Sequence, residues 1–196
     1  MERGYITLFR LRGVPLRAHW SVPLGVLVFS GMRFAPGIWL GMLSLILLHE
    51  LGHAALVSRA GLVNLGIDVT GFGGRCRWAG NPTPRERAAI AWGGVLAQLG
   101  VLAVAAPFWW LWGDSRGFLG DLLYALTSLN LFLIALNLVP FPPLDGAEAW
   151  PWFKLARDDR ARKKKWKDKL GSAPRRDPKA APQTLREALD EADRNR

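Results

Sequence analysis

The chain has 196 residues, half of them hydrophobic, and its formal net charge is +10. The single cysteine excludes an internal disulfide and a zinc site built from cysteines, so any metal must be bound by histidine or carboxylate side chains. Residues 153–196 hold 15 of the 26 Lys and Arg side chains but only 8 of the 16 acidic ones, which leaves residues 1–152 nearly neutral. We therefore expect a membrane-embedded domain over 1–152 and a basic, partly disordered cytoplasmic tail over 153–196.

The first 32 residues combine a basic stretch with a short apolar one. Arg10, Arg12 and Arg17 stand where the apolar core of a cleavable signal would begin, so residues 1–19 do not resemble a signal peptide. Residues 20–32 are uncharged and mostly apolar, but 13 residues are fewer than a membrane-spanning helix needs. This segment alone leaves open whether the chain crosses the membrane here.

The second apolar segment, residues 36–57, has 22 residues, and Glu50 is its only charged one. As a helix it would be about 33 Å long, enough to span a bilayer. His49 and His53 are four residues apart and so share one helical face, and Glu50 can deprotonate a metal-bound water. This His-Glu-x-x-His pattern predicts two zinc ligands and the general base of a metalloprotease. The alternative is a hydrogen-bonded core pair, but such groups are costly at membrane depth unless they have a function.

A loop over residues 58–87 follows, and it carries five arginines. Residues 67–70 and 75–78 alternate in polarity around a glycine-rich turn at 71–74, which predicts a short β-hairpin on the cytoplasmic side. An exposed strand edge in this hairpin could hold an extended substrate by added backbone hydrogen bonds. An ordinary surface hairpin is the equally weighted alternative.

Two further apolar segments complete the membrane domain. Residues 88–112 contain no charge, and residues 122–139 end at a proline-rich stretch. If residues 20–32 also span, every strongly basic piece lies on one side of the membrane, which is the positive-inside pattern. We therefore expect an all-α polytopic fold with about four transmembrane helices and both termini in the cytoplasm.

A catalytic zinc site needs a third protein ligand, and Asp145 is the best candidate because His19 is the only other histidine. An Asp-Gly pair after prolines is by itself an ordinary turn. In the four-span topology, however, Asp145 follows the last span on the side where the helix of His49 and His53 ends. Both features therefore converge at the same leaflet. His19 can either line a water path or lie at the interface beside Trp20, and the second reading is the stronger one.

These motifs together resemble the site-2 protease family of intramembrane zinc proteases. The resemblance rests on His49-Glu50-Leu51-Gly52-His53 and on the later stretches 137–140 and 143–146, and it covers residues 13 to about 147. It implies one zinc ion held by His49, His53 and Asp145, with Glu50 acting on the water. It also implies hydrolysis of a peptide bond in or near a transmembrane segment of a membrane protein. The chain departs from the family at Gly93-Gly94 and Gln98, where similar members often have Gly-Pro, a small residue and Asn.

Two asparagines in the last apolar segment, Asn130 and Asn137, are seven residues apart and so share a helical face. They can hydrogen-bond a substrate carbonyl or the oxyanion. Hydrogen bonding between helices is an equally good interpretation.

The tail and the overall function each leave an alternative open. Lys163, Lys164, Lys165 and Lys167 with their basic neighbours favour anionic lipid headgroups as partners, and we expect no nucleic acid. For the membrane domain, the alternative to a protease is a catalytically inactive scaffold or sensor that keeps the zinc site. A transporter would need polar residues in several helices, and the third segment has almost none besides Gln98.

Overall fold

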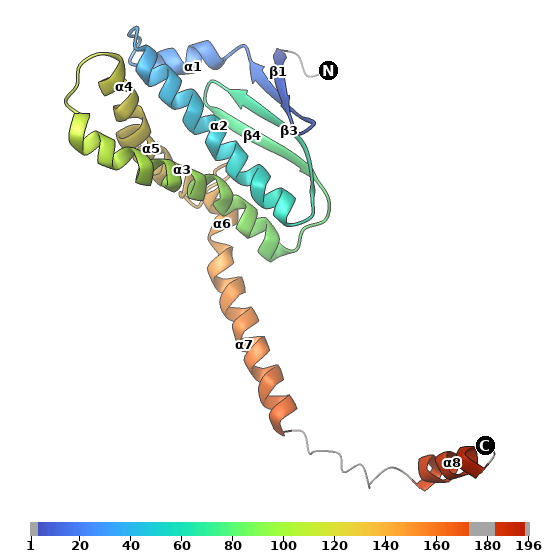
Figure 1. The fold of residues 1–196 in the computed structure, drawn as a ribbon. Helices are drawn as coiled ribbons and strands as arrows, with labels where there is room; N and C mark the ends of the chain where they lie inside the picture. Colours follow the sequence, from blue (N-terminus) through green and yellow to red (C-terminus); the bar gives the residue numbers. More distant parts are fainter. Residues whose placement is uncertain (1–3, 173–182, 195–196) are drawn as a thin grey trace. The chain divides into compact units, whose positions relative to one another are not determined.

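In the computed structural model, helix α2 (Pro36–Arg59) is the element around which the first part of the chain is arranged (Figure 1). The structure describes residues 4–172 and 183–194. The chain divides into two compact units, Met1–Ala156 and Arg157–Arg196. Within the first unit, α2 contacts helix α3 (Pro84–Trp112), the short helix α1 (Val22–Phe29) and two strands of a sheet.

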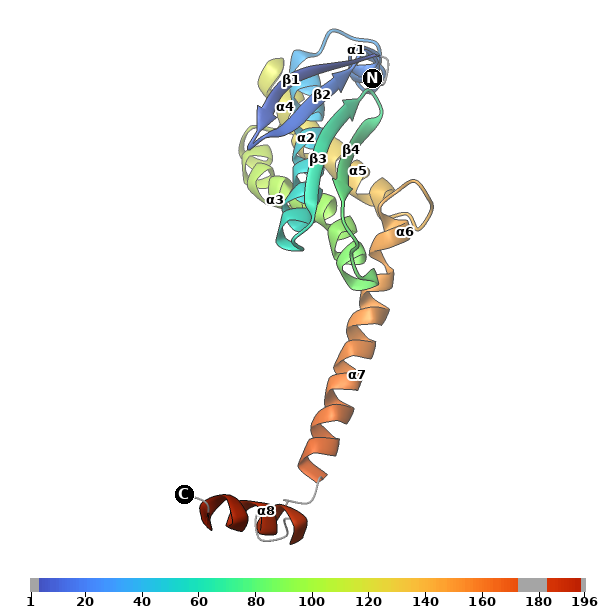
Figure 2. The ribbon, with the colours of Figure 1, turned by 90° about the vertical axis from the view of Figure 1, so that its right-hand side faces the viewer.

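The sheet has four strands in the order β1-β2-β3-β4: β1 (Tyr5–Leu11), β2 (Val14–His19), β3 (Val63–Thr70) and β4 (Gly73–Ala79). β1 and β2 form one antiparallel hairpin, β3 and β4 form a second, and β2 pairs in parallel with β3. The second hairpin is the one predicted from sequence, and the first was not predicted. Figure 2 shows the sheet lying beside α2 and α3, with β1 at one edge and β4 at the other.

The two faces of this sheet differ in polarity because side chains alternate along each strand. Leu16 and Ile67 are register partners on β2 and β3, and both are buried with Ala54 of α2 in one apolar cluster. Their neighbours Arg17 and Asp68 form the next register pair and therefore point to the opposite face. There Arg17 binds both carboxylate oxygens of Asp68 at 2.7 Å. The sheet thus turns an apolar face to α2 and a charged face away from it.

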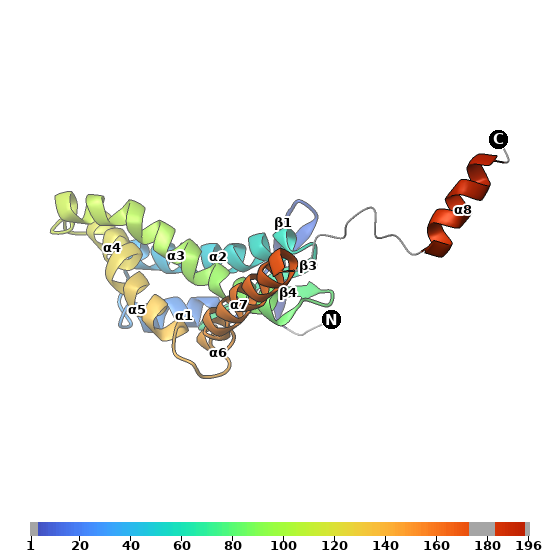
Figure 3. The ribbon, with the colours of Figure 1, turned by 90° about the horizontal axis from the view of Figure 1, so that it is seen from below.

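Helix α3 begins at a capping box in which Thr83 accepts from the Glu86 N–H and Glu86 accepts from the Thr83 N–H. The last apolar segment is built from α4 (Phe118–Tyr124), the π-helical turn η1 (Ala125–Leu129) and α5 (Asn130–Asn137), which follow one another without a break. Figure 3 shows α2 and α3 running side by side. By length and composition, residues 36–59, 84–112 and 118–137 are long and apolar enough to cross a membrane. The molecule is therefore a mostly helical, integral membrane protein with a small sheet.

The structure differs from the sequence prediction at the first expected span. Residues 20–32 contain only α1, whose eight residues are about 12 Å long, well short of the roughly 30 Å hydrocarbon layer. The six-residue strand β2 precedes it and adds about 20 Å. After α2 the chain turns back, so β3 runs in the direction opposite to α2 (Figure 1). β2 runs parallel to β3, and so β2 and the following α1 lead the chain towards the beginning of α2. β1 and β3 satisfy the backbone hydrogen bonds of β2.

Membership of one sheet also places residues 5–19 beside residues 63–79. The sequence argument required a fourth transmembrane helix to bring these two basic regions to the same side of the membrane. Pairing of β2 with β3 places these regions next to each other without a fourth long helix.

After α5 the chain passes through a proline-containing loop into helix α6 (Gly146–Ala149) and then helix α7 (Pro151–Ser172). The second unit also contains helix α8 (Gln183–Arg194). Residues 173–182 and 195–196, part of the tail expected to be disordered, lie outside the described residues.

Candidate metal centre

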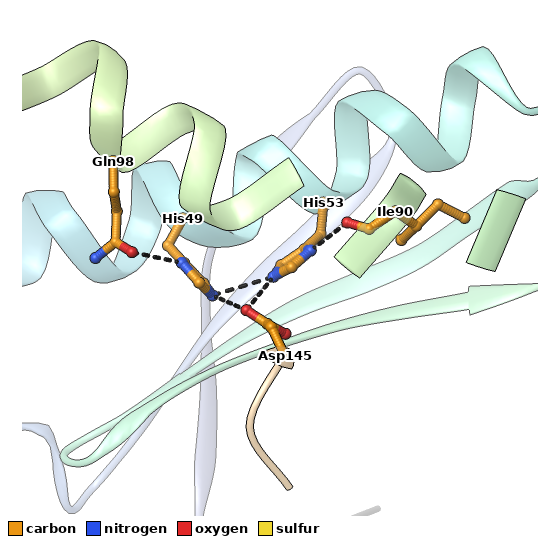
Figure 4. Close-up of polar contacts among 5 residues, drawn as sticks. All are labelled: His49, His53, Ile90, Gln98 and Asp145. Atoms are coloured by element: carbon orange, nitrogen blue, oxygen red, sulfur yellow. Dashed lines mark hydrogen bonds and ion pairs between the residues drawn. The ribbon is translucent and has the colours of Figure 1, made fainter. Parts of the chain in front are cut away.

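His49 and His53 lie one turn apart on α2 and point to the same side of the helix (Figure 4). Pro36 occupies the first turn of this helix, and an unbroken apolar sequence carries it on to the histidines. Both side chains are almost completely buried. Their Nε2 atoms are 3.0 Å apart, so the two rings face a common point.

Asp145 reaches this point from the loop between α5 and α6. Its Oδ2 atom lies 2.9 Å from Nε2 of His49 and 3.2 Å from Nε2 of His53 (Figure 4). Prolines at 140, 142 and 143 keep the loop out of a helical conformation, and Asp145 is the residue from which α6 starts. Asp145 follows His53 by 92 positions in the sequence, yet the fold brings all three predicted ligands together.

The geometry of these three side chains fits a tetrahedral zinc site. With metal–ligand distances of about 2.0–2.1 Å, ligand atoms in a tetrahedral site lie about 3.3 Å apart, close to the three separations seen here. Asp145 Oδ2 is buried, and no described residue donates a hydrogen bond to it. Two nitrogen atoms and one carboxylate oxygen therefore converge on one point, and no hydrogen-bond donor of the described residues occupies that point. This is what a cation site requires.

The other nitrogen of each imidazole is already occupied, which determines the tautomer. Nδ1 of His49 lies 3.0 Å from Oε1 of Gln98, and Nδ1 of His53 lies 2.7 Å from the carbonyl oxygen of Ile90. Both partners are acceptors, so each Nδ1 carries the proton and each Nε2 presents its lone pair to the shared point. In the sequence, Gln98 is a departure from a family pattern and a rare polar residue in its segment, but neither feature assigns it a role. Its isolation in the apolar run of α3 was the available signal of a polar role.

Glycines allow α3 to approach the two histidines closely. A methyl group at Gly94 would overlap the ring of His49, and one at Gly93 would overlap the backbone of Gly52 on α2. The Gly93-Gly94 pair, which departs from the family pattern, therefore gives α3 the close contact from which Ile90 and Gln98 reach the imidazoles.

Glu50 lies on the side of α2 that faces strand β4. It is buried, and a methyl group at Gly74 would overlap its side chain. The glycine-rich turn predicted from sequence thus has a second function besides reversing the chain, because Gly74 leaves room for the carboxylate. Glu50 and the three converging side chains line one cavity of about 570 Å³.

The cavity has an apolar part and a strand-lined part. Its apolar lining comes from Phe29, Met42, Ile46, Leu133 and Leu136. Gly73, Gly74, Arg75, Cys76 and Trp78 line it from β4, the edge strand of the sheet. An extended backbone beside this edge would therefore lie in the same cavity as Glu50.

The two asparagines have different surroundings. Asn130 is fully buried, and its Nδ2 donates to the backbone carbonyls of Gln98 on α3 and Leu126, so it bonds between helices. Asn137 is half-buried and lines the cavity. His19 is not among the cavity-lining residues, and its Nδ1 lies 2.8 Å from the Ser21 hydroxyl beside Trp20.

Electrostatics distinguish Asp145 from Cys76. Burial by itself would raise the pKa of Asp145, but in the metal-free protein the two imidazoles, when protonated, donate to it and attract it, which outweighs burial and holds that pKa well below the usual range. Burial and, to a smaller extent, the nearby Glu50 carboxylate together raise the pKa of the Cys76 thiol to about 12. The thiol therefore stays protonated at neutral pH, and Asp145 stays an anion.

Comparison with known proteins gives relatives of one kind. The chain is 30% identical over 149 residues to a zinc metalloprotease of Methanocaldococcus jannaschii, a match that covers 72% of this chain and 43% of that protein. It is 30% identical over 168 residues to a Mycobacterium tuberculosis protein that carries the name zinc metalloprotease Rip3, covering 74% of this chain and 42% of the relative. The chain thus spans less than half the length of both relatives.

A solved structure and a search of family models complete the comparison. The site-2 protease from Methanocaldococcus jannaschii superposes with a TM-score of 0.61 at 25% sequence identity, covering 74% of this chain and 69% of that one. No family model matches the chain.

Proposed function

The chain belongs to the site-2 protease family, and we propose that it is a membrane-embedded zinc endopeptidase that hydrolyses a peptide bond in or near a transmembrane segment of another membrane protein. The observation that carries this proposal is the convergence of His49, His53 and Asp145 beside Glu50 in one cavity. The ligand set is two imidazoles and one carboxylate, and it leaves a fourth position open.

The proposed roles follow from where each side chain lies. His49, His53 and Asp145 would hold one zinc ion per chain. The bound ion would supply Lewis acidity and lower the pKa of a water molecule. Glu50 would accept a proton from the attacking water, whose oxygen bonds to the substrate carbonyl carbon. The same carboxyl group would then give that proton to the leaving nitrogen as the C–N bond breaks.

The substrate would lie in an extended conformation along the free edge of β4. An edge strand presents unpaired N–H and C=O groups, and an added strand can pair with them. A transmembrane segment is helical before cleavage, so this pairing would also expose its backbone to Glu50. Asn137, half-buried in the same cavity, would donate a hydrogen bond to the substrate carbonyl oxygen. Asn130 is the weaker candidate for this role because its Nδ2 already bonds two backbone carbonyls.

The basic tail and the orientation of the chain are separate parts of the proposal. Helix α7 carries nine Lys and Arg side chains and three Asp side chains between Lys154 and Lys169. We propose that it binds anionic lipid headgroups and that both termini are cytoplasmic, because basic segments are retained on that side.

The variant Glu50→Gln tests the catalytic proposal. Glutamine preserves the size of the side chain but cannot accept the proton, and no proposed ligand is changed. Loss of a positioned general base typically costs about 10²–10⁴ in rate. We expect the purified variant to keep its zinc, while uncut single-span membrane proteins accumulate in cells that carry it.

Glu187→Gln, which also removes one negative charge from an exposed residue of α8, is the matched control. It should keep both zinc and cleavage. Wild-type cleavage by Glu50→Gln with zinc retained would show that Glu50 carries no chemistry. If uncut membrane proteins fail to accumulate even in cells that lack the whole chain, a scaffold or sensor with a zinc site would replace the protease.

A further inference from the structure

One turn of α3, from Ile90 to Gly94, contacts His49 and His53 directly. It also contacts the segment that follows Asp145. The Ile90 carbonyl accepts from His53, and Gly94 lies against the His49 ring. Between them, Trp92 projects towards the segment that follows Asp145, where its indole N–H donates to the carbonyl of Ala149 at 2.9 Å. The same turn therefore contacts α2 on one side and, on the other, residues 138–150, which we call the Asp145 segment.

Asp145 depends on such contacts more than the histidines do. His49 and His53 belong to a 24-residue helix, whereas Asp145 lies at the end of a loop between α5 and the four-residue α6. Its Oδ2 has no hydrogen-bond donor in the described part of the chain. The position of the carboxylate is therefore set by what holds the loop.

A second tryptophan closes this loop from the other end. The indole N–H of Trp150 donates to the carbonyl of Leu138 at 2.7 Å, which joins the residue after α6 to the residue after α5. Gly146 lies so close to the Leu138 carbonyl that a methyl group there would overlap it. The two ends of the segment 138–150 are thus fastened together.

The two indoles also pack against each other and against a shared phenylalanine. The centroids of the Trp92 and Trp150 rings are 6.0 Å apart, and each ring lies within 5.8 Å of the Phe153 ring. Arg87, one turn earlier on α3, approaches Glu148 at 3.6 Å on the same segment. Several contacts therefore bind the Asp145 segment to α3, and the Trp92 hydrogen bond is the nearest of them to the histidine contacts.

We propose that Trp92 and Trp150 are positioning residues that hold the Asp145 carboxylate at the histidine pair and thereby set the affinity of the metal centre. This inference rests on the proposed zinc site. Trp92 lies in an uncharged apolar run where the sequence gives it no special role, and the structure gives its N–H a partner on the loop. Without these bonds the loop would sample other positions, and binding a metal would have to order it.

The test is the zinc affinity of the full-length purified protein, measured by competition with a chromophoric chelator. Trp92→Phe keeps an aromatic ring against Trp150 but removes the N–H. Loss of an outer contact that orients a metal ligand typically lowers metal affinity about 10–100-fold, and we expect about a tenfold loss. Trp150→Phe should give a similar loss.

Trp110→Phe is the matched control, because it removes an indole N–H from the same helix at a residue that is 85% exposed. We expect its zinc affinity to be unchanged. Wild-type zinc affinity in Trp92→Phe would overturn the proposal. If Trp92→Phe does not fold, Trp150→Phe decides in the same way.

A double-mutant cycle separates positioning from general destabilisation. In an Asp145→Ala background, Trp92→Phe should not weaken residual zinc binding further, because the carboxylate it positions is gone. An equal loss in both backgrounds would show that Trp92 supports the fold alone, and that too would overturn the proposal. None of these measurements needs a substrate, so their outcome is independent of whether Glu50 performs hydrolysis.

Discussion

Asp68 and Asp145 have opposite surroundings. Asp68 is held by the guanidinium groups of Arg17 and Arg77, at 2.7 and 2.9 Å, and it joins β2, β3 and β4. Asp145 has no guanidinium partner among the contacts described and meets only two imidazoles. A buried charge is retained where it is paired or coordinates a metal, so Asp68 is a structural residue and Asp145 remains available to a cation.

The first residue-scale prediction compares Asp145 with His19. Asp145→Ala removes one of three proposed ligands. Its zinc affinity should therefore fall by more than the roughly 10–100-fold that is typical when a residue contacting a metal ligand is removed. His19→Ala should leave zinc affinity unchanged, because His19 bonds Ser21 outside the cavity. Zinc content and chelator competition on the two purified variants provide the measurement. Loss of metal in His19→Ala with metal retained in Asp145→Ala would show that the third ligand has been assigned wrongly.

At the scale of elements, β4 has two different sides. One side pairs with β3 along Gly73–Ala79, and the other is the edge that lines the cavity. β3, by contrast, pairs on both sides, and Val69 is buried between Ala18 and Gly74. A change that tests the edge alone must therefore be made in β4.

Proline at successive positions of β4 tests substrate pairing. Adjacent residues of a strand direct their N–H groups to opposite sides, so one of Arg75→Pro and Cys76→Pro removes an N–H from the free edge. The Cys76 N–H hydrogen-bonds Glu50 and so faces the free edge, which makes Cys76→Pro the edge variant. It should keep its thermal stability and zinc content while losing turnover, through the lost substrate pairing and the lost bond to Glu50. The other variant removes a bond to β3 and should melt at a lower temperature.

Unchanged turnover in the variant that keeps its stability would mean that the hairpin is an ordinary part of the sheet. Melting temperature checks the assignment of the two N–H groups, because Arg75→Pro should be the less stable variant.

At the scale of the whole first unit, the sheet links the N-terminal region to the loop between α2 and α3. Their strands are hydrogen-bonded, so the two regions lie side by side in one sheet, which packs against α2, one of the three apolar helices. The turn between α3 and α4, which contains Arg116, lies at the far ends of those helices.

A topology prediction follows from this arrangement. Reporters inserted in the β1–β2 turn near Arg12 and near Pro82, before α3, should be cytoplasmic, and a reporter after Arg116 should be outside. The physical reason is that β2 pairs with β3, whereas α3 separates Arg116 from both. A cytoplasmic signal after Arg116 would contradict both the three apolar spans and the placement of Asp145 near the histidines.

The tail prediction concerns lipids. Replacing the cluster Lys163, Lys164, Lys165 and Lys167 by glutamine should weaken sedimentation of the detergent-free second unit, residues 157–196, with vesicles that contain phosphatidylserine. Exposed charges near a membrane each contribute about 1 kcal/mol and are screened by salt, so the wild-type effect should fall as ionic strength rises. Equal sedimentation with purely zwitterionic vesicles would exclude headgroup charge as the cause.

The sequence by itself determined the features that depend on short spacings. Four residues between His49 and His53 place both on one helical face, and the long apolar runs predicted α2 and α3 with few errors at their ends. The glycine-rich turn at 71–74 predicted the β3–β4 hairpin. Asp145 required a topological argument, yet its convergence with the histidines was also predicted, because prolines and membrane-length helices restrict where it can lie.

Only the tertiary structure decided the features that need a distant partner. Residues 14–19 form a strand because β3, about fifty positions later, satisfies their backbone, and no local pattern reveals that pairing. The same holds for Gln98 beside His49, for Gly94 under the imidazole ring and for Trp92 bonded to Ala149. Each of these residues looks ordinary in its own segment, because its effect arises from a side chain or carbonyl that packing brings to it.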